Sequence, residues 1–295
     1  MNVLVTGATG FVGSYITKEL LTRGYNVCGI TQRGVTNYID DISSHPCFHL
    51  VQHDLSEEFD LPDNFHALIN AAAESRDNMA GFENYLSRNI IGTRNIINFC
   101  IKKSIKKVIH LSSMSIYGKV YDDIVTEKTE SISPGNYGLS KLFAERMFKE
   151  ENENIAAICL RLPGILGKEA KYPWLVQVLK ALVAKKPIVV YNPDALFNNA
   201  LYVKNLAYFT ADLVTMDLHA FDVINISAQS PLKIIDVIYH LSTALKLSPH
   251  IDISCEKRHS FIISTQRAEK YYHYTPEALR DTLNRFTEDY CTHKG

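Results

Sequence analysis

The sequence lacks several features that would assign it to particular classes of protein. It has no run of eighteen apolar residues that could cross a bilayer as a helix, and it does not begin with the basic segment and apolar run of a signal peptide. Basic residues number 31 and acidic residues 32, for a formal net charge of −1. We therefore expect no nucleic-acid partner and no membrane partner.

The sequence also lacks closely spaced pairs of cysteines. The six cysteines stand at positions 28, 47, 100, 159, 255 and 291. No two have CxxC spacing, so neither a zinc cluster nor a redox dithiol is expected. Cys28, Cys100 and Cys159 lie in apolar runs and should be buried as small hydrophobic residues. We expect no metal and a reduced, cytoplasmic compartment.

The clearest positive pattern is in the first thirteen residues. Asn2–Val5 predicts a short buried strand, and Phe11–Arg23 predicts a helix. Between them, Gly7, Gly10 and Gly13 stand at three-residue spacing. A strand, a glycine turn and a helix in this order offer a phosphate free N–H groups and the positive end of a helix dipole. The pattern predicts a dinucleotide-binding enzyme.

Apolar runs and helical periodicity alternate through the first half of the chain. Further strands are expected over residues 26–31, 48–52, 67–71, 107–111 and 155–160, with helices over 82–103 and 137–151. Such alternation is typical of parallel strands joined by crossover helices on both faces of a sheet. The sequence therefore predicts an α/β fold with a Rossmann-type doubly wound parallel sheet.

The pattern is looser after Leu162. Helices are expected over residues 174–184, 232–245 and 276–290, and extended segments over 187–191, 201–203 and 223–226. We expect residues 1–163 to form an NAD(P)-binding Rossmann domain with a return segment near 200–228. Residues 164–295 would form a smaller mixed substrate-binding lobe, interleaved with the first domain, and a substrate would lie in the crevice between them.

Three polar residues could carry out proton transfer. Tyr137 and Lys141 are four residues apart at the start of an expected helix, so they share one face. A nearby ammonium favours the phenolate form of a tyrosine, which suits proton exchange with an alcohol or a carbonyl oxygen. Ser113 follows the fifth strand, where a hydroxyl would point into the ligand crevice and could bond the reacting oxygen. The three residues predict hydride-transfer chemistry.

Together these segments resemble the extended short-chain dehydrogenase/reductase superfamily, often called the NAD-dependent epimerase/dehydratase family, of the type that modifies nucleotide sugars. The resemblance covers most of the chain. It rests on TGATGFVG at 6–13, DL at 54–55, NAAA at 70–73, NIIGT at 89–93, SSMSIYG at 112–118, PGNYGLSK at 134–141 and RLPGILG at 161–167. Motifs of moderate strength are specific when they occur together in the family's order.

The resemblance implies a role for each matching residue. It places the pyrophosphate against Gly7, Gly10, Phe11, Val12 and Gly13, the adenine against Asp54 and Leu55, and the nicotinamide half against Ala71, Ala72 and Ala73. Tyr137 would be the acid/base, and Lys141 would bind the nicotinamide ribose and favour the Tyr137 phenolate. Ser113 would polarise the substrate oxygen. Asn89 would have a structural role, supporting the local backbone and a proton-relay water.

The end of the second strand bears on the choice of dinucleotide. An acidic residue there would bond the ribose 2′-hydroxyl, whereas an arginine would accept a 2′-phosphate. This chain has Gln32 and Arg33 at that point and no carboxylate. We therefore expect NAD(P) as cofactor, with NADP(H) favoured over NAD(H) and Arg33 as the phosphate partner. The alternative is that Arg33 is a solvated loop residue.

Other positions depart from the family's pattern or match it in part. Sugar-nucleotide 4,6-dehydratases of the family carry an Asp-Glu pair after the catalytic hydroxyl, where this chain has Met114 and Ser115, so dehydration is not expected. Related epimerases often place a diphosphate-binding arginine where this chain has Asn198. Arg258 matches a second arginine of the family and is the expected substrate contact besides Ser113, although it could equally be a surface residue.

These observations favour an NAD(P)-dependent oxidoreductase or epimerase that acts on a hydroxyl or keto group of a nucleotide-activated sugar, as a 4-ketoreductase or a 4-epimerase. One alternative is an NADPH-dependent reductase of a small non-nucleotide ketone. A cofactor-binding regulator without catalysis is disfavoured because Ser113, Tyr137 and Lys141 are all present. Family members often dimerise through the helices that correspond to residues 82–103 and 139–149, so we also expect a homodimer.

Overall fold

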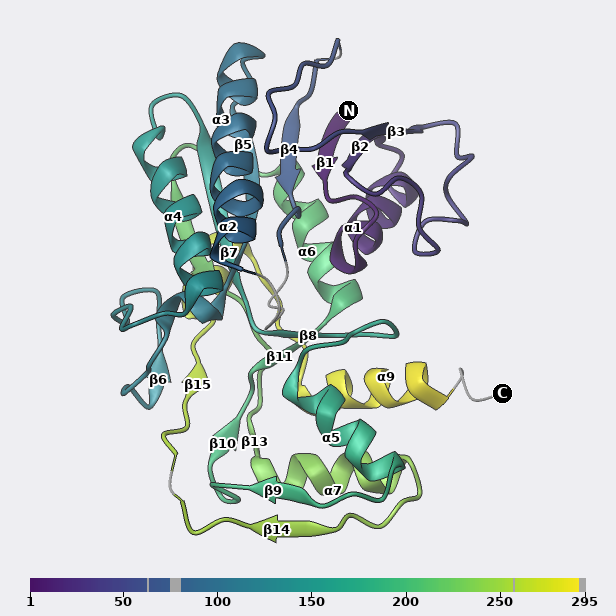
Figure 1. The fold of residues 1–295 in the computed structure, drawn as a ribbon, viewed down its shortest axis with the longest axis vertical. Coiled ribbons are helices and arrows are strands. Elements are labelled where there is room, and N and C mark those ends of the chain that lie inside the picture. Colours follow the sequence, from purple (N-terminus) through teal and green to yellow (C-terminus); the bar gives the residue numbers. More distant parts are fainter. Residues whose placement is uncertain (63, 75–80, 257, 292–295) are drawn as a thin grey trace. The chain divides into compact units, whose positions relative to one another are not determined.

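The computed structural model describes residues 1–62, 64–74, 81–256 and 258–291 (Figure 1). The chain divides into two compact units. The first consists of residues 1–118, 133–161 and 206–224, and the second of residues 119–132, 162–205 and 225–295. The first unit therefore includes a late return segment, and the second includes a segment from the first half of the chain. Their assignment as cofactor domain and substrate lobe stays a prediction.

A seven-stranded sheet forms the centre of the first unit. Its order is β12-β7-β5-β4-β1-β2-β3, with bounds β1 Asn2–Thr6, β2 Asn26–Thr31, β3 Phe48–Gln52, β4 Ala67–Asn70, β5 Lys107–Ser113, β7 Ala156–Leu162 and β12 Asp222–Asn225. Strands β1 to β5 pair in parallel. The order reverses between β1 and β4, and ligands of such sheets bind at the carboxyl ends of the strands where this reversal occurs. The predicted doubly wound sheet is confirmed.

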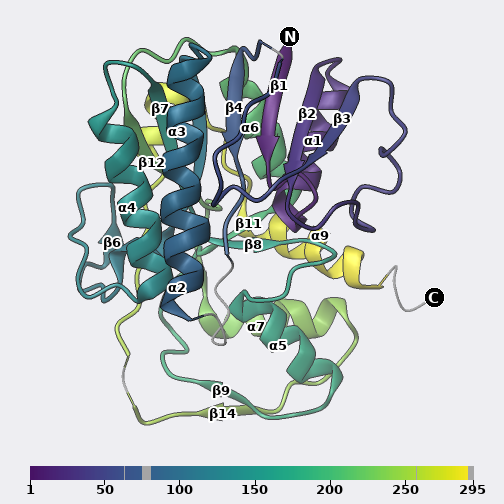
Figure 2. The same cartoon turned by 45° about the horizontal axis from the view of Figure 1, so that its top comes forward.

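Helices cover both faces of this sheet (Figure 1, Figure 2). Helices α3 and α4 lie on one face and α1 and α6 on the other; the bounds are α1 Phe11–Thr22, α2 Phe82–Tyr85, α3 Gly92–Lys102, α4 Asn136–Glu150 and α6 Val203–Thr215. Arg23, just after α1, donates hydrogen bonds to Asp212 and to the carbonyl of Tyr208 on α6, which fixes those two helices together. Helix α6 is missing from the sequence prediction because the strand expected over 201–203 passes into it without a turn.

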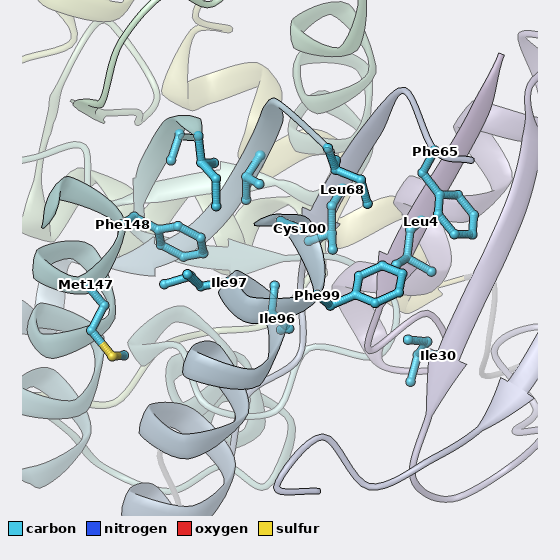
Figure 3. Close-up of a cluster of buried hydrophobic side chains, with 14 of the residues drawn as sticks. Leu4, Ile30, Phe65, Leu68, Ile96, Ile97, Phe99, Cys100, Met147 and Phe148 are labelled. Carbon is cyan, nitrogen blue, oxygen red and sulfur yellow. The ribbon is translucent and has the colours of Figure 1, made fainter. Parts of the chain in front are cut away.

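The core of the first unit lies between the sheet and helices α3 and α4 (Figure 3). Phe99 and Ile97 of α3 and Phe148 of α4 are at most 2% exposed, and they pack against Leu4 and Leu68 of the sheet. Apolar residues recur along both helices at the spacing that places them on one side. Burial of such side chains is the main favourable term in folding, and it fixes α3 and α4 against the sheet.

The cysteine expectations can be compared with this core. Cys28, Cys100 and Cys159 are at most 6% exposed, as predicted. Burial raises the pKa of the Cys100 thiol to about 12, which makes it an unreactive apolar group. None of the helices in the described ranges is long and apolar enough to span a membrane.

The second unit is built from short strands and helices around a separate core. Its strands pair two by two as β10-β13, β11-β8, β14-β9 and β15-β6, with bounds β6 Ile124–Val125, β8 Gly164–Leu166, β9 Ile188–Val190, β10 Leu196–Phe197, β11 Ala200–Tyr202, β13 Leu232–Lys233, β14 Ile251–Ile253 and β15 Ile262–Ile263. Its helices are α5 Trp174–Val183, α7 Ile234–Ala244, α8 Gln266–Tyr272 and α9 Leu279–Cys291. Helices α5, α7 and α9 share one apolar core.

Candidate active site

The glycine turn after β1 is shaped by close backbone contacts. Gly7 has φ of +69°, and a Cβ on it would lie 2.8 Å from the Cα of Ala72, after β4. A Cβ on Gly13 would lie 2.1 Å from the Gly7 carbonyl oxygen. A side chain at Gly7 or Gly13 would therefore force the strand ends and α1 apart. These two glycines let the turn lie between the ends of β1 and β4.

Gly10 is different because its surroundings are open. The nearest atom to a Cβ there is the Gly7 carbonyl oxygen at 3.3 Å. Gly10 caps α1 with extended backbone and no side-chain hydrogen bond, and the first turn of α1 has no acidic residue. The N–H groups of Phe11, Val12 and Gly13 thus belong to a helix start without a protein cap. These residues fit the pyrophosphate of a dinucleotide, which needs an open turn, free N–H groups and a helix dipole.

The strand ends beside the turn are joined by buried polar side chains. The Thr6 hydroxyl donates to Oδ1 of Asn70 over 2.8 Å, and the Asn70 amide nitrogen lies 3.1 Å from Nδ1 of His110. All three are at most 1% exposed. The N–H of Ala72 also reaches the Thr6 hydroxyl, at 3.4 Å. This chain of contacts links β1, β4 and β5 and holds the Ala71–Ala73 segment beside the glycine turn.

The segment after β3 holds an ionised carboxylate. Oδ1 of Asp54 accepts the Ser56 N–H at 2.9 Å and the Ser56 hydroxyl at 2.8 Å, and Oδ2 accepts the Gln32 amide at 2.6 Å. The backbone hydrogen bond from Ser56 is the largest cause of a lowered Asp54 pKa. Leu55 is partly buried against the core. Gln32 therefore joins the end of β2 to the place where the adenine is expected.

Arg33 lies next to this junction and is exposed. Its backbone N–H donates to the hydroxyl of Thr31 at 3.3 Å, and that hydroxyl lies 2.6 Å from the hydroxyl of Thr9. The backbone at Arg33 is thus fixed to the glycine turn, while the residue as a whole is exposed. That Arg33 binds a 2′-phosphate stays a prediction.

Ser113 and Tyr137 belong to β5 and α4, two elements that are in close backbone contact. Ser113 ends β5 and caps the short helix Met114–Tyr117 by accepting the Ser115 N–H at 3.1 Å. At Gly138, beside Tyr137, a Cβ would lie 2.2 Å from the Ser115 carbonyl oxygen. The start of α4 can approach the end of β5 only because this residue is glycine. Both side chains are partly buried, and the ring of Tyr137 lies 6.1 Å from that of Tyr85.

Lys141 lies one turn further along α4 and is 4% exposed. Its ammonium donates to the carbonyl of Leu111 on β5 over 2.7 Å. Burial lowers its pKa to about 8, because the low-dielectric surroundings disfavour the charged form. The lysine is therefore still largely protonated at neutral pH, and its charge lies at the same sheet edge as Ser113.

Asn89 joins the segment after β4 to helix α4. It lies in the π-helical segment Leu86–Ile91, which interrupts the single helix predicted over 82–103. Its Oδ1 accepts the Glu74 N–H at 2.7 Å, and its amide donates to the Ser140 hydroxyl at 2.9 Å. That hydroxyl donates in turn to the Tyr137 carbonyl at 2.8 Å. π-Helical turns often mark functional sites, and this one holds a buried amide that bonds both the segment after β4 and helix α4.

A buried ion pair between Arg161 and Glu145, next to these residues, was not predicted from the sequence. Arg161, at the end of β7, donates to both oxygens of Glu145, at 3.1 and 2.8 Å, and to the Tyr117 hydroxyl at 2.8 Å. The Ser112 hydroxyl donates to the same carboxylate at 2.5 Å. The available signals were Arg161 at the start of the RLPGILG motif and the four-residue spacing of Tyr137, Lys141 and Glu145 on α4.

In the second unit, the two positions that match phosphate-binding arginines of related enzymes have different surroundings. Asn198 is 3% exposed, and its amide donates to the carbonyls of Ala228 and Ile263, while its Oδ1 accepts the Ile263 N–H. Its side chain is thus committed to the backbone. Arg258 is exposed, lies 3.5 Å from the centroid of the Tyr191 ring and pairs with Glu256 at 3.0 Å.

The arrangement in the first unit can support proton exchange beside a bound dinucleotide. An open helix start, a hydroxyl, a phenol and a buried ammonium all belong to the carboxyl edge of one parallel sheet. That edge is where a ligand binds in folds of this kind. In the described residues, no group of three or more His, Cys, Asp or Glu side chains could hold a metal ion.

Comparisons with known proteins agree with this geometry. The chain is 27% identical over 163 residues to a low-salt glycan biosynthesis protein of Haloferax volcanii, a match that spans about half of each protein, 52% of both lengths. It is 26% identical over 251 residues to a UDP-glucose 4-epimerase of Caenorhabditis elegans, covering 76% of this chain and 67% of that protein. A solved UDP-glucuronic acid 4-epimerase of Bacillus cereus, in complex with NAD, has the same fold, with a TM-score of 0.84, 24% identity and 99% of each chain covered.

Residues 3–226 match the NAD dependent epimerase/dehydratase family, and this span contains all the site residues discussed above except Arg258. The match confirms the resemblance inferred from the motifs, the enzymatic nature of the chain and its dependence on a nicotinamide dinucleotide. The chain belongs to the NAD dependent epimerase/dehydratase family of enzymes.

Proposed function

We propose that the chain catalyses NAD(P)-dependent oxidation or reduction at a hydroxyl or keto carbon of a nucleotide-activated sugar, as a 4-ketoreductase or a 4-epimerase, with Tyr137 as acid/base. The observation that carries the proposal is the close contact of α4 with the end of β5 at Gly138, which brings the elements that bear Tyr137, Lys141 and Ser113 together. Relatives named as acting on UDP-glucose and dTDP-glucose support the substrate class.

Each residue of the trio has a separate task in this mechanism. A bound nicotinamide would accept or supply the hydride at the sugar carbon. The Tyr137 hydroxyl exchanges the proton with the sugar oxygen, as its phenolate when an alcohol is oxidised and as its phenol when a ketone is reduced. Ser113 donates a hydrogen bond to the same oxygen, and the Lys141 ammonium stabilises the phenolate.

Dehydration is not part of the proposal, although one curated relative is a dTDP-glucose 4,6-dehydratase. The elimination of water needs a further acid and base close to the reacting carbons. Met114 and Ser115 occupy the turn after Ser113, where the dehydratases of the family carry Asp and Glu. Neither side chain can act as a carboxylate acid or base.

The cofactor is proposed to be NADP(H) rather than NAD(H), with Arg33 as the partner of the 2′-phosphate. Two observations support this proposal: the end of β2 has no carboxylate, and Gln32 is bonded to Asp54 beside an exposed Arg33. The Bacillus cereus neighbour contains NAD, which makes the comparison of the two cofactors informative. Tighter binding of NAD than of NADP by the wild-type chain, measured by calorimetry, would refute the preference.

Arg258 is proposed to contact the phosphate of the substrate. Its guanidinium is exposed and has one carboxylate partner, Glu256, which a phosphate could replace. Arg258→Gln should then raise the KM for a nucleotide sugar without lowering kcat. An unchanged KM for a nucleotide sugar would remove Arg258 from the site.

The substrate class and the acid/base are tested together. A thermal-shift screen of UDP-sugars and dTDP-sugars, with NAD and NADPH in turn, should give a clear stabilisation for the true nucleotide. With that substrate, Tyr137→Phe should lower turnover by roughly 10²–10⁴-fold while cofactor binding is retained. Turnover that survives the substitution would overturn the mechanism, and a shift by small ketones alone would favour the small-ketone alternative.

The two proposed reactions can be separated by their cofactor demand. A 4-epimerase returns the hydride to the sugar, so it should need no net reductant and should keep its cofactor through purification. A 4-ketoreductase should consume NADPH in proportion to product. Absorbance at the reduced nicotinamide band, followed with and without the nucleotide sugar, measures this difference.

A homodimer formed through α2, α3 and α4 is proposed as the assembled state. Large apolar side chains are exposed on these helices, among them Phe82 at 53%, Ile101 at 41% and Phe143 at 49%. Exposed apolar residues gathered on neighbouring helices are typical of protein–protein contacts. Light scattering on the purified chain should give the dimer mass, and Phe143→Asp should give a monomer; a monomeric wild type would refute the proposal.

A further inference from the structure

One face of α4 carries two charged side chains that are both buried against the sheet. Lys141 is 4% exposed and Glu145, one turn further, is 3% exposed. Residues four apart on a helix lie on the same face, so this face continues the line that begins at Tyr137. Buried charges are costly unless they are paired, which calls for a reason why Glu145 is there.

The carboxylate of Glu145 is held from two strands. Arg161 of β7 donates to both of its oxygens, and the Ser112 hydroxyl of β5 donates to one of them at 2.5 Å. Ser112 directly precedes Ser113, and Arg161 also holds the hydroxyl of Tyr117 in the turn that follows. The carboxylate thus ties α4 to the strand end and the turn that surround Ser113.

Glu145 also sets the charge balance around the Lys141 ammonium. The groups that interact with it are His110 and the Leu111 carbonyl on β5, Cys159 on β7, and Glu145 on its own helix, and Glu145 is bonded in turn to Arg161 of β7. Burial raises the pKa of Cys159 and lowers that of His110, so both are neutral near pH 7. Glu145 is therefore the anion of this group, and it interacts with two buried cations, Lys141 and Arg161.

We propose that Glu145 is a positioning residue for Lys141 and Tyr137: clamped by Arg161 and Ser112, its carboxylate fixes the sheet-facing side of α4 and keeps the buried ammonium charged at the proton-exchange site. The functional part rests on the proposed role of Lys141 beside the cofactor. The electrostatic part can be measured in the folded chain without turnover.

The direct readout is the pKa of Lys141, followed by NMR of the ¹³Cε resonance in lysine-labelled protein and assigned by its loss in Lys141→Met. Wild type should titrate at about 8. Glu145→Gln keeps the shape but removes the anion, so the pKa of Lys141 should fall below its wild-type value. Arg161→Met removes the opposing cation and should raise it. A purely structural role predicts no such opposite changes.

Tyr117→Phe is the matched control, because it removes one hydrogen bond to Arg161 without changing any charge. It should leave the Lys141 pKa where it is in wild type. If either charge variant fails to fold, the coupling of Glu145 and Lys141 can still be tested in the wild type. There the ¹³Cδ resonance of Glu145 should shift at the pH at which Lys141 titrates. Equal pKa values in all folded variants, or no response at Glu145, would overturn the proposal.

The functional consequence is read from cofactor binding. As pH rises, the affinity of Glu145→Gln for the dinucleotide should weaken at a lower pH than in wild type, because Lys141 loses its proton earlier. A shifted Lys141 pKa without this change would refute the role toward the cofactor and leave the electrostatic part intact. Failure of Tyr137→Phe to lose activity would refute the proposed mechanism but would leave the NMR result unaffected.

Discussion

The two units of the chain use arginine in different ways. In the first, Arg161 is 9% exposed, and both oxygens of Glu145 and the Tyr117 hydroxyl fix its guanidinium. In the second, Arg258 is 55% exposed and has Glu256, itself 60% exposed, as its carboxylate partner. The buried cation is held in one geometry by the fold. The exposed one can exchange its partner for a ligand at little cost.

The difference extends to the other polar groups. In the first unit, Thr6, Asn70, His110 and Lys141 are buried and bonded to one another or to backbone before any ligand binds. Such preorganisation suits a site in which a cofactor must be held in one position for hydride transfer. In the second unit, the buried Asn198 serves the backbone, and the cation expected to contact substrate lies at the surface.

The strongest test of this contrast uses glycine. A Cβ at Gly13 would overlap the Gly7 carbonyl, whereas one at Gly164 of the second unit would lie 3.2 Å from its nearest neighbours. Gly13→Ala should cost about 5 kcal/mol or more in unfolding free energy, or prevent folding, and Gly164→Ala about 1 kcal/mol. Urea unfolding measures both, with Gly81→Ala as the control in open space. Similar costs at Gly13 and Gly164 would remove the contrast.

The next test removes each arginine. Arg161→Ala leaves the buried Glu145 carboxylate without its cation, so it should cost about 3–5 kcal/mol of unfolding free energy. Arg258→Ala removes an exposed pair, which salt screens and solvent weakens, and should leave the unfolding midpoint unchanged. Chemical denaturation at low and high salt measures both. A large salt-dependent loss in Arg258→Ala would show that the second unit also relies on fixed charge.

Burial of the Lys141 ammonium should lower the unfolding free energy of the first unit. Its pKa is about 8 when folded against 10.5 in the open chain, so between pH 8 and 10.5 the unfolded state binds more protons. The burial cost is therefore fully present below pH 8 and is relieved as pH rises to 10.5. Lys141→Met should raise stability at pH 7, by at most about 3 kcal/mol, while activity is lost. A destabilised Lys141→Met, seen by calorimetry, would contradict this trade-off.

The smallest expected effect is at histidine. Burial, and then the charge of Lys141, lower the pKa of His110 well below 6.5. As pH falls below 6.5, His110 binds a proton in the unfolded chain but stays neutral in the folded chain. The unfolding free energy should therefore fall by about 1 kcal/mol per pH unit. His110→Gln should flatten this slope. His250→Gln, an exposed position in the second unit, should leave it unchanged, and equal slopes in the two variants would refute the assignment.

The sequence predicted most of the first unit because its signals are local. Strands at 26–31 and 48–52 were predicted with the bounds the structure shows, since short apolar runs between turns specify buried parallel strands. The glycine spacing indicated the phosphate-binding turn for the same reason. Helix α6 was missed because no turn residue separates it from β11, and β10, β13, β14 and β15 are too short to produce a pattern.

For the candidate site too, local sequence patterns predicted some features and missed others. The sequence alone determined the family, and it predicted the dinucleotide turn and the proposed trio Ser113, Tyr137 and Lys141, because the spacing of residues along one strand or helix fixes their relative positions. Only the tertiary structure decided that Glu145 and Arg161 form a buried pair, that Asn89 joins the segment after β4 to α4, and that Asn198 bonds backbone. Those contacts join segments far apart in the chain, and a side chain's charge state and partner depend on burial, which no local spacing encodes.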